Sequence, residues 1–239
     1  MKNILKRSIN YLGYNLSRYK KEKDPKFIYN RMLNKFNIKT IFDIGANEGN
    51  YGLYLRDIGF KGNIISFEPL SSAYIKLIKT SKKDINWQVA PRMAIGNEDG
   101  VTNINISENS ESSSILNILD SHVTADNNSM FIGREEVTIH KFDTIFHELN
   151  TNQLNYFLKI DTQGFEDRVL DGASEILKNI IGIQVELSFV QLYSGQILYN
   201  EMVDKLNKLG YNLWAYYPVF INSETGKLLQ VDAIFFRNL

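Results

Sequence analysis

Short apolar runs alternate with amphipathic segments along most of this 239-residue chain. Strands are predicted where β-branched, aromatic and other apolar residues cluster, at 40–44, 63–67, 85–90, 94–96, 101–107, 137–140, 156–160, 180–187, 211–217 and 233–237. Helices are predicted where apolar residues recur at helical spacing, at 27–36, 49–57, 71–81, 143–149, 166–177 and 200–209. Ser71 is the predicted N-cap of one of these helices. The repeated order of strand and helix predicts one α/β domain with a mostly parallel, doubly wound sheet.

Residues 108–134 depart from this pattern, because they are polar, rich in Ser and Asn, and without a helix or strand period. A long segment of this kind inside a compact domain is typical of a lid over a functional site or of a disordered excursion. Asp24-Pro25 marks an earlier break. We therefore expect an N-terminal segment, residues 1–24, followed by a single domain, residues 25–239, that includes the polar insertion.

The N-terminal segment is basic, with seven Lys or Arg residues against two acids, although the whole chain has a net charge of zero. Within residues 1–24, one side of a helix would carry Leu5, Ile9, Leu12 and Leu16. Such a helix either packs on the domain or on a second subunit of a homo-oligomer, or it lies on an anionic membrane surface. The remaining sequence has no basic cluster typical of nucleic-acid binding, so neither DNA nor RNA is expected as a partner.

Composition narrows the expected cellular context. The chain has no cysteine, which excludes disulfides and thiolate metal sites. No apolar stretch approaches the roughly 20 residues that span a bilayer, and no signal-peptide pattern is found. We expect a cytoplasmic protein, with peripheral contact at the inner membrane face if residues 1–24 bind lipid. The abundance of Asn, Ile and Lys suggests an AT-rich bacterial genome.

Candidate chemistry begins at the turn after the first predicted strand, DIGANEG at 43–49. Its two glycines are four positions apart, which differs from the G-x-G-x-x-G spacing that suits a dinucleotide diphosphate. The second predicted strand ends at Glu68-Pro69, where an acid can accept hydrogen bonds from both ribose hydroxyls. Together these features predict a nucleoside-type cofactor pocket. Taken separately, the glycines could simply permit the turn, and Glu68 could be a solvated loop acid.

Further motifs carry a family resemblance: AIGN at 94–97, FDT at 142–144, FLKIDTQGFEDRVLDGA at 157–173 and QVEL at 184–187. With FDIGANEGNYG at 42–52 and FEP at 67–69, they make residues 38–239 resemble the FkbM-type S-adenosylmethionine-dependent methyltransferases. The motif at 157–173 is the most specific of them. Gln163 is a departure, because the family often has Glu at that position, and we therefore assign it no charged role.

This resemblance implies a Rossmann-like fold with a seven-stranded sheet, mostly parallel, whose last strand runs antiparallel between its neighbours. An antiparallel strand starts at the edge of the sheet where the parallel strands end. Acids at the ends of five predicted strands are therefore expected on one edge: Asp43, Glu68, Asp161, Glu186 and Asp232.

S-adenosylmethionine is the expected cofactor, with Glu68 on its ribose and Ala94 beside its adenine. The full set of expected cofactor-binding residues is Asp43, Gly45, Asn47, Gly49, Glu68, Pro69 and Ala94. Methyl transfer to oxygen requires an aligned acceptor and removal of its proton. Asp161 is the first candidate for that base or for orienting the acceptor, with Lys159 and Glu166 behind it. Glu186 and Asp232 are candidates for binding acceptor hydroxyls.

Other side chains have weaker claims to a role. A divalent metal among the acids is an alternative that we do not favour, and no metal ligand is assigned. His122, in the polar insertion, is an alternative base, and Tyr193 is a candidate for stacking on an acceptor ring. The aromatic residues Trp214, Tyr216 and Tyr217 alternate as in a strand and are expected in the core.

The sequence therefore predicts an O-methyltransferase that acts on a sugar hydroxyl of a glycan or glycolipid. The basic N-terminal segment favours work at a membrane face, and the acid-rich edge favours hydrogen bonding to hydroxyls. Three alternatives stay open: a natural-product O-methyltransferase, a nicotinamide oxidoreductase, and a non-catalytic glycan-recognition protein that kept the cofactor pocket. The missing dinucleotide glycines argue against the oxidoreductase.

Overall fold

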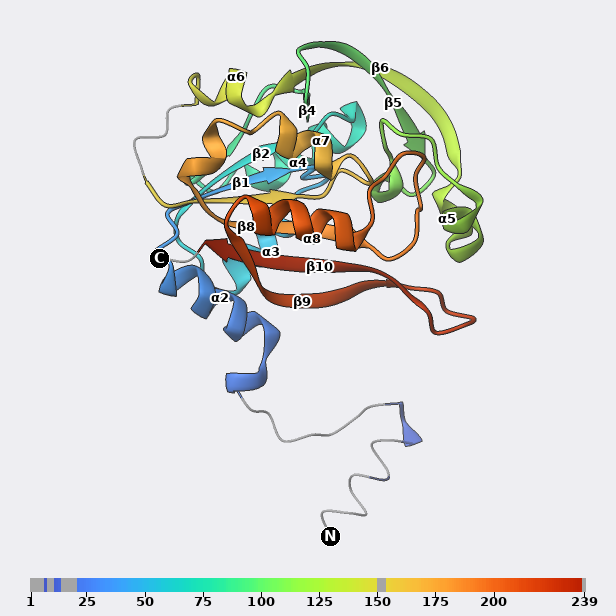
Figure 1. Ribbon diagram of the computed structural model, residues 1–239, viewed down its shortest axis with the longest axis horizontal. Coiled ribbons are helices and arrows are strands. Elements are labelled where there is room, and N and C mark those ends of the chain that lie inside the picture. The colour runs from blue at the N-terminus through green and yellow to red at the C-terminus, as the bar shows by residue number, and fades with distance from the viewer. Residues whose placement is uncertain (1–6, 8–10, 14–20, 150–153, 238–239) are drawn as a thin grey trace.

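A seven-stranded sheet in the order β3-β2-β1-β7-β8-β10-β9 forms the centre of the molecule (Figure 1). The computed structural model describes residues 7, 11–13, 21–149 and 154–237. The strands are β1 (Thr40–Ile44), β2 (Asn63–Phe67), β3 (Trp87–Val89), β7 (Tyr156–Ile160), β8 (Ile180–Ser188), β9 (Tyr211–Ile221) and β10 (Leu228–Arg237). β10 is antiparallel to both of its neighbours, β8 and β9, whereas β3, β2, β1, β7 and β8 pair in parallel. The Rossmann-like sheet implied by the sequence is confirmed.

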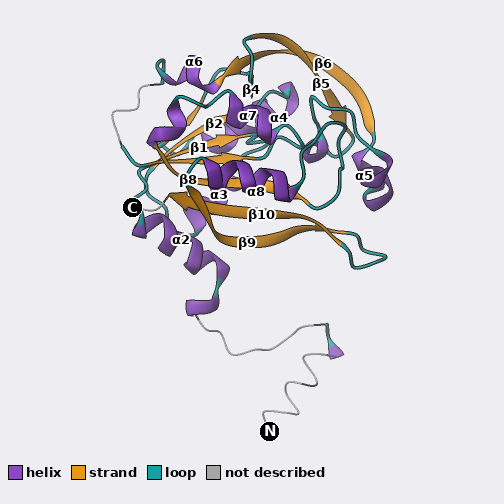
Figure 2. Cartoon of the chain, in the orientation of Figure 1, coloured by secondary structure: helices purple, strands orange, loops and turns teal. Residues whose placement is uncertain are grey.

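Helices cover both faces of this sheet, as Figure 2 shows by colour. They are α2 (Pro25–Lys35), α3 (Asn50–Asp57), α4 (Ser71–Ser81), α6 (Phe142–Phe146), α7 (Glu166–Asp171) and α8 (Tyr199–Lys208). On one face, Ile41, Ile64 and Phe157 pack in a cluster with residues of α2 and α3. On the other face, Phe42 and Leu158 belong to a cluster with residues of α6, α7 and α8. Burial on both faces explains why these strands are continuous apolar runs.

A second, three-stranded sheet in the order β4-β6-β5 arches over one side of the domain (Figure 1). Its strands are β4 (Ala94–Gly96), β5 (Gly100–Ser107) and β6 (Phe131–Lys141). Between β5 and β6 lie the short helices η2 (Ser110–Ser112), α5 (Asp120–Ala125) and η3 (Asn127–Ser129). The polar insertion therefore has regular structure, and backbone hydrogen bonds link it to the loop after β8, from Leu119 to Leu192 and from Ser194 to Asn117. Its movement as a lid stays a prediction.

Two details of the helices differ from the sequence predictions. Leu70, not Ser71, is the N-cap of α4. The amide and hydroxyl of Ser71 instead donate to the carboxylate of Glu135 on β6, each over 2.7 Å. The helix predicted at 166–177 ends at Asp171 and is followed by a separate 3-10 turn, η4 (Ile176–Asn179). The first difference accompanies a contact with β6 of the second sheet, 64 residues away in the sequence.

The aromatic run on β9 lies on an edge strand, and its predicted place in the core is wrong for two residues. Trp214 is 43% exposed and Tyr216 is 61% exposed. Trp214 still packs edge-on against Phe36 and Phe236 of the cluster under α2, and Tyr217 packs against the same cluster. Alternation along a strand does not reveal whether a neighbouring strand or helix covers its sides, so the pattern alone could not place this strand at the edge.

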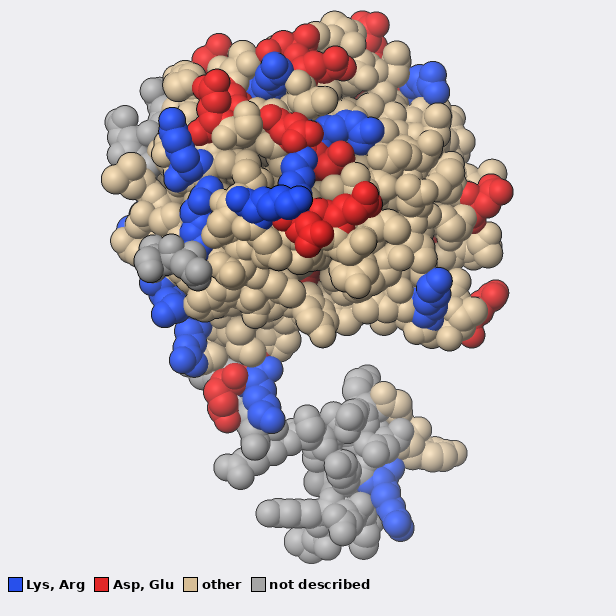
Figure 3. Space-filling view, in the orientation of Figure 1, with Lys and Arg blue, Asp and Glu red and all other residues tan. Residues whose placement is uncertain are grey.

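Charged side chains are mixed over the domain. In the view of Figure 3, Lys and Arg side chains lie beside Asp and Glu across the middle of the face, without a wide basic area. Among the described residues, no helix is long and apolar enough to cross a membrane. The amphipathic helix predicted within residues 1–24 lies mostly outside the described residues, so its contacts stay a prediction.

The close approach of Gly172 to β4 of the second sheet can be tested by substitution. A Cβ at this position would lie 1.7 Å from the carbonyl oxygen of Gly96 in β4. Because that neighbour is backbone and cannot rotate away, we expect Gly172→Ala to lower the free energy of unfolding by about 3 kcal/mol. The matched control is Gly133→Ala, whose Cβ would meet nothing closer than Ile106 at 3.6 Å. Urea unfolding curves measure both, and equal stability of the two variants would contradict this packing.

Candidate active site

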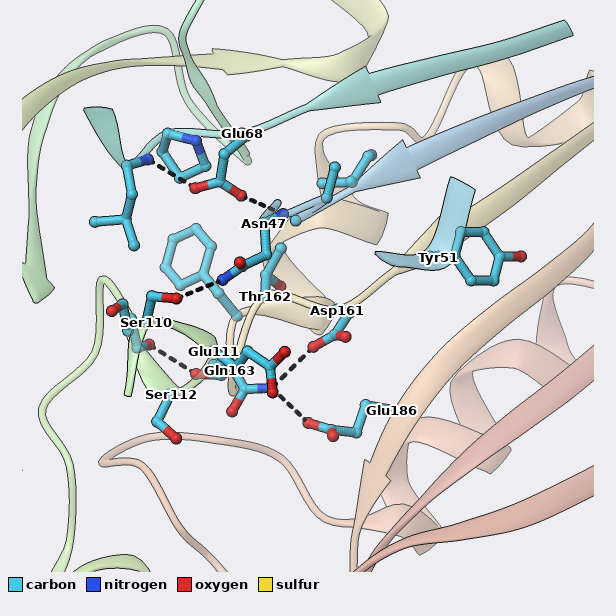
Figure 4. Close-up of a pocket in the computed structure, with 18 of the residues that line it drawn as sticks. Asn47, Tyr51, Glu68, Ser110, Glu111, Ser112, Asp161, Thr162, Gln163 and Glu186 are labelled. Atoms are coloured by element: carbon cyan, nitrogen blue, oxygen red, sulfur yellow. Dashed lines mark hydrogen bonds between the residues drawn. The ribbon is translucent and has the colours of Figure 1, made fainter. Parts of the chain in front are cut away.

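A cavity of about 420 Å³ lies at the edge of the sheet where β1, β2 and β7 end. Residues of the turn after β1, of the polar insertion and of β8, β9 and β10 line it. This volume falls within the range of about 300–1,000 Å³ that is usual for small-molecule sites. Figure 4 shows how side chains from these separate segments converge on it.

The turn after β1 and the acid after β2 form one hydrogen-bonded unit. Glu68 is 4% exposed, and its carboxylate accepts from the amide of Asn47 at 2.7 Å and from that of Leu70 at 2.8 Å. Burial raises the pKa of Glu68 to about 7, although these two hydrogen bonds lower it in part. Glycine is required at position 45, because φ is +78° and a Cβ would lie 1.8 Å from the carbonyl oxygen of Asp161. The strand ends are thus held in close contact.

An apolar wall continues from Glu68. It consists of Phe67, Leu70, Ala94, Ile95, Ile104 and Phe165, all of which line the cavity. Pro69 also lines it, and its carbonyl accepts a hydrogen bond from Arg92. An apolar slot beside a buried carboxylate suits a flat base joined to a ribose.

A row of polar side chains crosses the sheet just beneath the cavity. In the register of the strands, Asp43 pairs with Ser66 on β2 and with Lys159 on β7, and Lys159 pairs with Gln184 on β8. The hydroxyl of Ser66 donates to the Asp43 carboxylate over 3.2 Å. Tyr29 donates from below to the Gln184 side chain over 2.8 Å. This row places a charged pair inside an otherwise apolar sheet.

Lys159 is the centre of that row and is 5% exposed. Its Nζ lies 3.1 Å from Oδ1 of Asp43, 3.5 Å from Oδ2 of Asp161 and 3.1 Å from the carbonyl oxygen of Gly45. Its ammonium also lies 5.2 Å from the centre of the Tyr51 ring. Burial by itself lowers the pKa of Lys159, but the carboxylates of Asp43 and Asp161 raise it above its ordinary value. Lys159 is therefore held as a cation between the two carboxylates, and its predicted catalytic role stays a prediction.

Three acids meet at the far side of the cavity, and amide side chains hold them. Gln163 Nε2 donates to Asp161 at 2.8 Å and to Glu186 at 3.2 Å, as Figure 4 shows. Gln230 Nε2 also donates to Glu186, and Asp232 is the register partner of Glu186. Burial, followed by the charge of Asp161, raises the pKa of Glu186 well above its ordinary value and that of Asp232 to about 6.

Glu166 orders the turn that carries Asp161 and Gln163. Its carboxylate accepts from the amides of Thr162 and Gly164, at 2.9 and 3.1 Å. Burial raises its pKa to about 7. Glu166 does not line the cavity, so it positions its neighbours rather than touching a ligand.

The polar insertion closes the remaining side and contacts both halves of the site. Asn47 Nδ2 donates to Ser110 Oγ at 3.2 Å, next to the turn after β1. Ser114 Oγ donates to the carbonyl oxygen of Gln163 at 2.7 Å, next to the acids. Gln163 has a φ of +55°, which is unusual for a residue with a side chain and is maintained by these contacts.

Most of the predicted site residues lie on the cavity wall: Gly45, Asn47, Glu68, Pro69, Ala94, Lys159, Asp161, Glu186 and Asp232. Two do not. Asp43 is fully buried behind Lys159, and Gly49 is the N-cap of α3, packed near Leu77 and Trp87. Their individual roles stay predictions.

Tyr193 is fully buried, and its hydroxyl donates to Gln163 Oε1 and to the carbonyl of Ser112. The predicted stacking of Tyr193 on an acceptor ring is therefore wrong.

Sequence reasoning missed the amides that organise the acids. Gln184 and Gln230 each stand two positions before an acid on a strand, so they share its face and line the same cavity. This two-residue spacing is the sequence signal that could have placed the two amides beside the acids. Gln163 is recognised from sequence only as a departure from the family pattern, because its two acceptors depend on the register in which β7 pairs with β8.

In the part of the chain that the structure describes, no three His, Cys, Asp or Glu side chains are arranged to hold a metal ion.

Comparison with known proteins agrees with this geometry. The model of the methyltransferase FkbM domain matches residues 43–213, which include the turn after β1, Glu68 and the segment around Asp161. The fold and this match define an S-adenosylmethionine-dependent methyltransferase. The chain belongs to the FkbM methyltransferase family, and membership implies S-adenosylmethionine as the methyl donor.

Solved structures that match this chain include an rRNA methylase from Streptococcus thermophilus, at 10% identity over 91% of this chain and 98% of that chain, with a TM-score of 0.46. Precorrin-6y C5,15-methyltransferase from Geobacter metallireducens GS-15 is 10% identical over 88% of this chain and 87% of that chain, with a TM-score of 0.45. TehB from Haemophilus influenzae is 11% identical over 88% of this chain and 62% of that chain, with a TM-score of 0.46. We infer nothing about substrate from these similarities. A search of curated proteins finds no match to this chain.

The buried ion pair can be tested by its effect on stability. Lys159→Met leaves the Asp43 carboxylate buried without its cation, so we expect a loss of about 3–5 kcal/mol in the free energy of unfolding. Adding Asp43→Asn should recover part of this loss, because the uncompensated charge is then gone. The control is Lys76→Met, which breaks an exposed pair with Glu48 and should cost at most about 1 kcal/mol. Strictly additive effects of Lys159→Met and Asp43→Asn in urea unfolding would show that the pair is not coupled.

The raised pKa of Glu68 predicts that the affinity of the protein for the nucleoside part of the cofactor depends on pH. Because its pKa is about 7, it is mostly protonated at pH 6 and mostly ionised at pH 8. The ionised form accepts ribose hydroxyls better, so affinity for 5′-methylthioadenosine, which carries no group that titrates in this range, should rise about tenfold between these pH values. Glu68→Gln should bind more weakly and lose the pH dependence in calorimetry. A wild-type affinity that is flat with pH would remove Glu68 from the ribose site.

Proposed function

We propose that this chain is an O-methyltransferase whose acceptor is a sugar hydroxyl of a glycan or glycolipid, in a bacterial biosynthetic pathway. One observation carries the proposal. A single cavity joins a nucleoside-like half, built from Gly45, Asn47 and Glu68, to a half lined by carboxylates and amides, with Asp161 where they meet.

The cofactor half fits S-adenosylmethionine in its chemistry. The buried Glu68 would hold the ribose hydroxyls, the apolar wall at Leu70, Ala94 and Ile95 would cover the adenine, and the turn at Gly45–Asn47 would face the amino-acid part. When bound, the cofactor supplies an electrophilic methyl group on a sulfonium. Carboxylates near this half are compatible with that positive charge.

The opposite half supplies the groups that an alcohol acceptor needs. Asp161 lies at the junction, with Gln163 donating to one carboxylate oxygen and Lys159 near the other. In this proposal the Asp161 carboxylate would take the proton of the acceptor hydroxyl, while bound S-adenosylmethionine would supply the methyl group to that oxygen and leave as S-adenosylhomocysteine. Lys159 Nζ lies 3.5 Å from Asp161 Oδ2, and Gln163 fixes the orientation of the carboxylate. Glu186 and Asp232 then accept hydrogen bonds from neighbouring hydroxyls of the sugar.

The mixed charge on the face in Figure 3 supports a small or glycan acceptor rather than a nucleic acid. Positive and negative side chains are mixed on the face in Figure 3, and a phosphate backbone would need a basic stripe. Peripheral contact with the inner membrane face through residues 1–24, cytoplasmic location and homo-oligomer formation stay proposals that rest on the sequence.

Asp161→Asn tests the assignment of the base. We expect the variant to bind S-adenosylhomocysteine with unchanged affinity in calorimetry but to lose at least about a hundredfold in turnover. The assay incubates the protein with radiolabelled S-adenosylmethionine and extracts of the source cell, and follows label into polysaccharide, glycolipid and small-molecule fractions. Label in the glycan or glycolipid fraction with the wild type but not with Asp161→Asn is the expected result. Label only in small molecules would favour a natural-product acceptor, and normal turnover of the variant would remove Asp161 as base.

A further inference from the structure

The cavity is strongly acidic. Six carboxylate side chains line it: Glu68, Glu111, Asp126, Asp161, Glu186 and Asp232. Lys159 is the single lysine or arginine among the lining residues. Its ammonium already faces the buried Asp43 and therefore contributes little positive charge to the open space. An acceptor that brought a phosphate or carboxylate into this space would meet repulsion from several sides.

The carboxyl groups lie closest together where the acceptor would lie. Glu186 and Asp232 are register partners on β8 and β10, and Asp161 is joined to Glu186 through the amide of Gln163. The partners that hold Glu186 are the neutral side chains of Gln163 and Gln230. Burial, followed by the charge of Asp161, raises the pKa values of Glu186 and Asp232, so ionisation of these two acids is unfavourable without a further cation. A cation placed between them would favour their ionised forms.

A second, independent observation concerns His122. Its side chain lines the cavity, the residue is 3% exposed, and Nδ1 has no hydrogen-bond partner among the described residues. The imidazole packs against the rings of Tyr193 and Phe220, with centroids 5.1 and 5.3 Å away. Burial lowers the pKa of His122 to about 4, against a smaller opposing effect of Asp126, so the ring is neutral at pH 7. A buried neutral imidazole without a partner is costly unless a ligand completes it.

Phe220 connects the two observations. It is the register partner of Gln230, which donates to Glu186, and it also lines the cavity beside His122. An apolar ring face, an unpartnered imidazole and a pair of uncompensated carboxylates therefore surround one end of the cavity.

We propose that this end binds the protonated amino group of an amino alcohol, such as an amino sugar, between Glu186 and Asp232, while His122 forms a hydrogen bond with a hydroxyl of the same molecule. This inference rests on the proposed function and narrows its acceptor class. The amino group compensates the two acids, and the hydroxyl to be methylated is left beside Asp161.

The test measures binding rather than turnover, so that it does not require the natural acceptor. The full chain is first saturated with S-adenosylhomocysteine at pH 7. Calorimetry then compares four methyl glycosides of the same ring: glucosamine, N-acetylglucosamine, glucose and glucuronic acid. We expect the glucosaminide to bind at least about tenfold more tightly than the glucoside and the N-acetyl compound, because it alone carries a cation. The glucuronide should bind most weakly of the four.

Three variants locate the effect. Glu186→Gln should remove most of the preference for the amino compound while keeping the affinity for S-adenosylhomocysteine, and Asp232→Asn should do so if the first variant is unstable. His122→Phe should weaken the binding of the glucosaminide and of the glucoside by a similar factor. The preference for the glucosaminide over the glucoside should therefore stay unchanged. Glu224→Gln, an exposed acid in the turn between β9 and β10, is the control that should change nothing.

Equal affinity for the four glycosides, absence of measurable binding by all of them, or an unchanged preference in both acid variants would overturn the inference. These outcomes differ from a failure of the proposed function, which would appear earlier, as absence of S-adenosylhomocysteine binding in the first step.

Discussion

The ion pair between Lys159 and Asp43 is the interaction on which the site depends. Two charges inside a parallel sheet are costly to desolvate, and they are tolerated because each finds its opposite within 3.1 Å. The pair joins β1 to β7 at the register position just below their carboxyl ends. The same ammonium reaches the carbonyl of Gly45 and the carboxylate of Asp161. One buried cation thus contacts both the turn after β1 and the carboxylate of Asp161.

Much of this arrangement could be predicted from the sequence, because it is local. Strands buried on both faces appear as continuous apolar runs, and the turn at 43–49 and the acid at 68 follow their strands directly. Since parallel strands end at one edge of a sheet, acids at those ends were expected to converge. Glu68, Asp161, Glu186 and Asp232 do so on the cavity wall, whereas Asp43 lies behind Lys159.

What could not be predicted depends on contacts between distant segments. The acid that binds the first turn of α4 is Glu135, which is 64 residues from Ser71. Gln230 reaches Glu186 only because β10 inserts between β8 and β9 in one particular register. The exposure of Trp214 follows from the place of β9 at the edge, which no periodicity encodes. The polarity of residues 108–134 signalled an unusual segment but gave no sign of which groups it would touch.

That segment is attached to both walls of the cavity within a few residues of chain. Ser110 is hydrogen-bonded to the cofactor turn, and Ser114 is hydrogen-bonded to the backbone beside the acids. A short connection of this kind transmits displacement, because moving one anchor strains the other. Both hydrogen bonds come from one five-residue run of the insertion, so the position of this run depends on the turn after β1 and on the backbone at Gln163 together.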